Sequence, residues 1–168
     1  MTVSREVRAA IGDVVVETTW IEYLVARLAE MGGRVGRDGN EGGEEYIRSL
    51  LRPQRADVLF KAARSATGKF DSAEAAARTE AWLNHAKELR EQRHALVHSI
   101  VIQEHCPGFT GYQVKGERVF ELSTRGIVDL ARRVHRHSEE GTYMSLFVWP
   151  EALGLVDADA DGGEHAGS

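Results

Sequence analysis

Apolar residues recur at steps of three and four along most of the chain, which is the spacing that places side chains on one face of an α-helix. The first stretch runs from about Thr2 to Met31 and carries Val7, Val14 and Ile21 at seven-residue intervals. Gly32-Gly33 follows directly, and glycine readily adopts the left-handed conformation that ends many helices. The pattern therefore predicts one long amphipathic helix that stops at these two glycines.

Two short helices and a second long one are predicted after a loop. Residues 34–43 are rich in glycine and polar side chains, which is typical of a mobile loop. Helical patterns then cover residues 44–51 and 55–67 and are separated by a proline. Asp71 or Ser72 can cap the next helix, which extends to about residue 99.

Side chains typical of β-strands follow this helix. They are concentrated in residues 100–104, 112–114 and 118–122. The last two segments are expected to form a small β-hairpin. Ser123 or Thr124 then caps a final helix, which can continue to about residue 147. Pro150 is expected to end the ordered structure.

These elements together predict an all-α fold, namely an antiparallel bundle of four to five helices with a small β-hairpin appendage. Residues 1–150 form the helical domain in this prediction. Residues 151–168 form an acidic disordered tail, because residues 157–168 contain three aspartates and one glutamate without apolar periodicity.

The composition is that of an ordinary globular protein, with 42% hydrophobic and 28% charged residues. The formal net charge of −5 argues against a sequence-reading DNA-binding domain, although it leaves room for one local phosphate site. No apolar run approaches the roughly 20 residues of a membrane span, and the N-terminus lacks the apolar stretch of a signal peptide. Cys106 is the single cysteine, which excludes an intrachain disulfide and a multi-cysteine zinc site. We therefore expect a cytoplasmic protein without a membrane partner.

One arginine interrupts the apolar face of the second long helix. Trp82, Ala86 and Leu89 define that face, and Arg93 stands at the next position on it, before Leu96. A buried guanidinium is costly unless it is paired and hydrogen-bonded. Arg93 is therefore either structural, paired with a carboxylate of another helix or reaching out to solvent, or part of a functional site.

Two histidines lie close to Arg93 in the sequence. His98 is five residues further on, and His94 is one helical turn before His98, so that the two rings can approach each other. The pair also allows a two-histidine metal site, but the chain has no His-Glu-x-x-His pattern and only His105 nearby as a third ligand. We expect neither a metal nor another cofactor.

The segment Arg93-His94-Ala95-Leu96-Val97-His98 resembles the motif of HEPN ribonuclease domains, which is an arginine, a polar residue, three mostly apolar residues and a histidine. His94 stands where that family most often has asparagine. The order of helices between residues 5 and 147 is similar as well, with the motif late on a long helix. A second Arg-x4-His match, Arg132 to His137, has mostly charged residues between its ends and is interpreted as a solvated face.

The resemblance implies a metal-independent endoribonuclease of the toxin or defence type that cleaves RNA by attack of the RNA's own 2′-hydroxyl. Arg93 would hold the phosphate oxygens and His98 would transfer a proton. His94 would orient the phosphate or His98, or act as the second proton-transfer group. The resemblance also implies a homodimer that pairs through this helix, and it leaves room for an antitoxin or regulatory protein partner.

Three other interpretations stay open. A non-catalytic HEPN-like helical module would bind a protein or nucleotide partner through the same face. A metal-dependent hydrolase would combine His94 and His98 with carboxylates from other helices. In a plain helical bundle, Arg93 would be only structural. RNA cleavage in the presence of EDTA separates the ribonuclease from all three.

Overall fold

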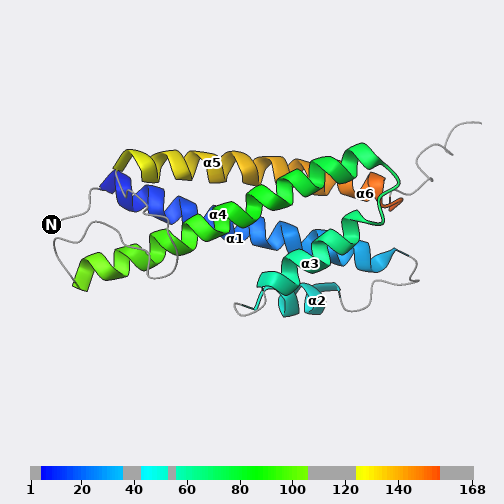
Figure 1. The fold of residues 1–168 in the computed structure, drawn as a ribbon, viewed down its shortest axis with the longest axis horizontal. Helices are drawn as coiled ribbons and strands as arrows, with labels where there is room; N and C mark the ends of the chain where they lie inside the picture. Colours follow the sequence, from blue (N-terminus) through cyan, green and yellow to red (C-terminus); the bar gives the residue numbers. More distant parts are fainter. Residues whose placement is uncertain (1–4, 36–42, 53–55, 106–123, 156–168) are drawn as a thin grey trace, which may run out of the picture.

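The computed structural model of the chain describes residues 5–35, 43–52, 56–105 and 124–155, without the side chains of residues 99–105 and 124. All regular secondary structure in these ranges is helical, which confirms the predicted all-α class (Figure 1). The predicted hairpin at 112–122 lies outside the described residues, as do most residues of the predicted loop at 34–43. Within the described ranges, no helix is long and apolar enough to cross a membrane.

Helix α1 (Arg5–Arg34) buries a continuous apolar face along its length. Val14, Val25 and Leu28 have no exposed surface. Thr18 is equally buried on this face, and its hydroxyl is satisfied because it donates to the backbone carbonyl of Val14. The seven-residue spacing of apolar side chains therefore predicted this helix and its buried face correctly.

The end of α1 differs from the prediction, because the helix continues through Gly32-Gly33 to Arg34. Gly32 lies against helix α3 (Ala56–Thr67), where a Cβ atom added to it would sit 2.2 Å from Cβ of Ala66. Glycine at position 32 therefore permits close packing of two helices and does not end the first of them.

Helices α2 (Gly43–Leu50) and α3 lie within one residue of their predicted bounds at each end. Ile47 and Leu50 of α2 are buried, and so are Leu59 and Phe60 of α3. Lys69, just after α3, donates its Nζ to the backbone carbonyl of Gly32 at 2.6 Å. These contacts join the two short helices to the C-terminal part of α1.

Helix α4 (Ala73–His105) begins as predicted and ends later than predicted. The Ser72 hydroxyl accepts a hydrogen bond from the backbone N–H of Ala75 at 3.2 Å, which confirms Ser72 as the cap. The β-type interpretation of residues 100–104 is wrong, because α4 continues through them. β-Branched residues lose only about 0.5 kcal/mol each in a helix, and extending an existing helix needs no new nucleus.

Helix α5 (Thr124–Tyr143) continues into a π-helical turn, η2 (Met144–Val148), and a short helix, α6 (Trp149–Ala152). Pro150 does not end the ordered structure as predicted. It lies in the first turn of α6, where the fixed φ of proline fits a helical backbone. Leu153 after α6 is buried, whereas the rest of the predicted tail, residues 156–168, lies outside the described residues.

Helices α1 and α5 lie side by side, and α4 crosses in front of them (Figure 1). Glu17 of α1 bonds to Ser138 of α5, and Trp20, further along α1, bonds to Thr142, further along α5. The two helices therefore run in the same direction. This parallel pair is a departure from a purely antiparallel arrangement.

Aromatic side chains fill the core near α6. Trp149 is fully buried and donates its indole N–H to the hydroxyl of Thr79 at 3.1 Å. It meets Trp82 edge to face, with ring centroids 5.5 Å apart. Trp82 in turn donates its N–H to the backbone carbonyl of His137 at 3.1 Å and stacks on the His137 ring. Both indole groups are thus satisfied, and α6 closes this end of the core.

Candidate functional site

Three charged side chains meet where α4 crosses α1. Nη2 of Arg93 donates to Oε1 of Glu22 at 3.1 Å, and Nε of Arg90 donates to the same oxygen at 2.9 Å. These side chains keep only 19% to 28% of their surface exposed. Arg93 therefore takes part in an ion pair between helices, as the structural interpretation of this residue requires.

His94 and His98 lie one turn apart on α4, and both are exposed. Their rings meet edge to face, with centroids 4.1 Å apart and planes at 66°. The pKa of His94 is lowered from its usual value, first by partial burial and then by the charges of His98, Arg90 and Arg93. The surroundings of His94 therefore favour the neutral ring, which can accept a proton.

The structure brings the three predicted site residues into one neighbourhood, because His94 interacts electrostatically with both Arg93 and His98. We call Arg90, Arg93, His94 and His98 the motif cluster. Its two guanidiniums face the single carboxylate of Glu22, which leaves a local excess of positive charge in a chain of net charge −5. Guanidinium and imidazole N–H groups on such a surface are suited to bind a phosphate.

A metal centre has less support than the phosphate site. No group of three or more His, Cys, Asp or Glu side chains is arranged to hold a metal ion in the part of the chain that the structure describes. His94 and His98 supply two imidazoles, and the side chain of His105 lies outside the described residues. The described side chains therefore provide no ligand set for the metal-dependent interpretation.

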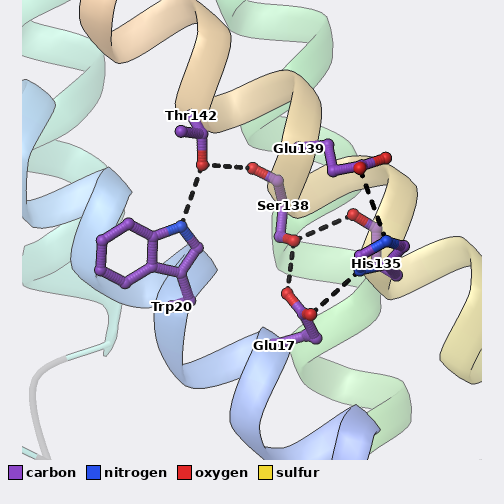
Figure 2. Close-up of polar contacts among 6 residues, drawn as sticks. All are labelled: Glu17, Trp20, His135, Ser138, Glu139 and Thr142. Carbon is purple, nitrogen blue, oxygen red and sulfur yellow. Dashed lines mark hydrogen bonds and ion pairs between the residues drawn. The ribbon is translucent and has the colours of Figure 1, made fainter.

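A second polar cluster, at the contact between α1 and α5, was not predicted from the sequence (Figure 2). The Glu17 carboxylate bonds to the Ser138 hydroxyl and, at 3.0 Å, to Nδ1 of His135. The pKa of His135 is raised, mainly by the hydrogen bond to Glu17 and then by the charge of Glu139. Burial acts to raise the pKa of Glu17, but the hydrogen bonds from Ser138 and His135 outweigh burial and lower it. This cluster joins the parallel helices.

A groove of about 540 Å³ runs between α1 and α5 beside this second cluster. Its charged lining residues are Glu6, Asp13 and Glu17 on α1 and Arg132 and His135 on α5. With more carboxylates than cations, the groove does not favour a polyanion such as RNA. Arg132 lines this groove, whereas His137 is buried in the core. The second Arg-x4-His match therefore does not bring its arginine and histidine to one surface.

Sequence reasoning did not assign Glu22 to the site. Its position at the edge of the buried face of α1 looks the same in the sequence as that of a solvated glutamate. The available signal is the spacing of Arg90 and Arg93, which places two guanidiniums on one side of a helix. Because one of them interrupts the apolar face, a carboxylate across the helix contact could have been expected.

We expect Glu22 and Arg93 to be energetically coupled. Glu22→Gln and Arg93→Met each remove one charge and keep most of the side-chain volume. In a double-mutant cycle from urea unfolding, the coupling free energy should be about 1 kcal/mol, because the two side chains are about four-fifths buried. A coupling of zero within error would mean that the ion pair does not persist in solution.

Comparisons with known proteins do not place the chain in a family. No protein-family model matches it, and no curated protein or solved structure is significantly similar to it. The candidate site is therefore defined by the geometry and chemistry of its own residues.

Proposed function

We propose that the protein is a metal-independent endoribonuclease of the HEPN type, and that the motif cluster is its active site. The observation that carries this proposal is the contact between two exposed imidazoles, those of His94 and His98, together with the electrostatic interaction of His94 with Arg90 and Arg93. Imidazoles transfer protons near neutral pH, and guanidiniums stabilise the charge that builds on a phosphate during cleavage.

The roles of the three predicted residues follow from their surroundings. Arg93 donates one N–H to Glu22, and the other N–H groups of its planar guanidinium can donate to phosphate oxygens. Glu22 restricts the guanidinium to one orientation, which lowers the entropy that phosphate binding would cost. His98, exposed beside His94, can reach the 2′-hydroxyl or the leaving oxygen of a bound RNA. No step in this reaction needs a metal or another cofactor.

Partner proteins are a further part of the proposal. Val97 stands between the two histidines in the sequence and is 40% exposed, an apolar side chain beside the active site. A second copy of the chain, pairing through α4, would cover it and place two motif clusters near each other. An antitoxin or regulatory protein that covered the same face would block access of RNA.

An RNA-cleavage assay in EDTA tests the ribonuclease proposal. Wild-type protein should cut single-stranded RNA into products with a 2′,3′-cyclic phosphate and a 5′-hydroxyl. Arg93→Ala and His98→Ala should each lower the rate at least about 100-fold, since each removes a group that acts in the transition state. His98 is exposed, so that His98→Ala leaves the fold unchanged.

Arg132→Ala is the matched control for this assay. It removes the same charge as Arg93→Ala, belongs to the second Arg-x4-His match and has a side chain that is 73% exposed. It should cleave within twofold of wild type. An inactive wild-type protein, or a His98→Ala protein as active as wild type, would refute the ribonuclease function.

A non-catalytic module is the second candidate, and the bond from Arg93 to Glu22 favours it. If Arg93 serves mainly to hold α4 against α1, the surface beside it binds a protein or nucleotide without reaction. In that case wild type shows no cleavage, and Arg93→Ala lowers partner binding or dimerisation together with stability.

A further inference from the structure

A lysine on α4 shares the helix face that carries the two exposed imidazoles. Lys87 stands seven residues before His94 and eleven before His98, and all three side chains are exposed. With 3.6 residues per turn, these separations bring a side chain back to within about 20° of its starting direction, on opposite sides for the two histidines. Lys87 is therefore in line with the middle of the histidine pair, about 10 Å along the helix axis before His94.

The ammonium group of Lys87 has no hydrogen bond or ion pair among the described residues, whereas Arg90 is paired with Glu22. Glu91 borders the same face one turn after Lys87, but no ion pair joins the two within the described ranges. Lysine binds phosphate as a point charge on a flexible stem, so that it needs no fixed hydrogen-bond geometry. An unpaired positive charge in line with the imidazoles is therefore suited to a phosphate group.

We propose that Lys87 binds a phosphate of the RNA other than the one at which cleavage occurs, and that the strand follows α4 from the motif cluster toward the start of the helix. This inference rests on the ribonuclease function proposed above. A stacked strand rises about 3.4 Å per nucleotide, so that about 10 Å corresponds to about three stacked nucleotides, or to fewer of an extended strand. Lys87 is therefore a positioning residue, and the preferred substrate is a single strand that continues beyond the cleaved linkage.

Substrate length separates this role from a structural one. Cleavage in EDTA is measured with a single-stranded RNA of about 12 nucleotides and with a dinucleotide, which holds only the cleaved phosphate. On the longer RNA, Lys87→Ala should lower kcat/KM about 3- to 10-fold through KM, with kcat changed less than about twofold. On the dinucleotide it should match wild type. Lys87→Arg keeps the charge and should restore cleavage of the longer RNA. Equal losses on both substrates, or no loss on the longer one, would overturn the inference.

The salt dependence of RNA binding gives a second readout that needs no cleavage. The probe is the longer RNA with all 2′-hydroxyls methylated, which leaves no group to attack the phosphate. The slope of log K against log salt should be smaller by about 0.7 in Lys87→Ala, because one phosphate contact with a single strand is lost.

Arg132→Ala is the matched control for the binding measurement. It also removes one positive charge from an exposed side chain, but Arg132 lines the groove that is rich in carboxylates. Its slope should equal that of wild type. A Lys87→Ala slope equal to that of wild type would overturn the inference while the ribonuclease function stands. A wild-type protein that binds the RNA through Lys87 but cleaves no RNA would overturn the ribonuclease function instead.

Discussion

Gly32→Ala is expected to lower the free energy of unfolding by about 2–3 kcal/mol, because the added methyl group has no space between α1 and α3. Its Cβ would lie 2.2 Å from Cβ and 2.8 Å from Cα of Ala66. Since Cα belongs to the backbone, the helices themselves would have to separate. The better helix propensity of alanine offsets only about 1 kcal/mol of this cost. Thermal unfolding should show a melting temperature roughly 5–10 °C lower than that of wild type.

Gly33→Ala is the matched control for this prediction. It makes the same chemical change one residue later in the same helix, where a Cβ would meet nothing within 4 Å. It should raise stability by about 0.5–1 kcal/mol, because alanine loses less conformational freedom on folding. Equal melting temperatures for the two variants would contradict the close packing of α1 against α3 at this point.

Acid should destabilise the protein through His137. The ring of His137 is 4% exposed, and its Nε2 has no hydrogen-bond partner among the described residues. Burial, followed by the charge of His85, lowers the pKa of His137 to about 4 from the usual 6.5. The folded state therefore favours the neutral ring, and the unfolded chain binds the proton more readily. The contribution of the neutral His137 ring to the free energy of unfolding should be fully present above pH 6.5. It should decrease by about 3 kcal/mol in total as the pH drops to about 4.

His137→Leu isolates this effect, since it keeps the approximate volume and cannot titrate. Urea unfolding of both proteins at several values between pH 7 and pH 4 should show wild type losing about 3 kcal/mol more than the variant. His135→Gln is the contrasting control. Because the pKa of His135 is raised, its contribution to stability depends on pH in the opposite direction. This contribution is present at low pH and is lost as the pH rises through that pKa. Parallel profiles for wild type and His137→Leu would show that His137 is not the acid-sensitive group.

The parts of the fold that the sequence predicted are those decided by local pattern. The spacing of Val7, Val14 and Ile21 was enough to predict α1 because the buried face extends over many turns. The wrong predictions concern residue types that are found in more than one structural context. Gly32 was interpreted as a helix end, but the approach of Ala66, which only the tertiary structure reveals, explains it. Likewise, the β-branched residues at 100–102 have a local preference that the already formed α4 overrides.

The residues of the candidate site also fall into those that one helix reveals in the sequence and those that only the tertiary structure reveals. Arg93 was predicted because a charged residue on an apolar face is visible in the sequence of one helix, and the contact of His94 with His98 follows from their spacing. Glu22 could not be predicted in the same manner, since it lies 71 residues away and reaches Arg93 only in the folded chain. Glu17 and His135 are 118 residues apart and illustrate the same limit.

The parallel pairing of α1 and α5 bears on how the chain is made. Helix α1 leaves the ribosome before α5, which ends at Tyr143. At translation rates of about 5–20 residues per second, α1 waits on the order of 5–20 s before the helix beside it is complete. Until then, the apolar side chains of α1, which include Val14 and Ile21, are not packed against α5. The nascent chain should therefore be a client of ribosome-associated chaperones until α5 emerges.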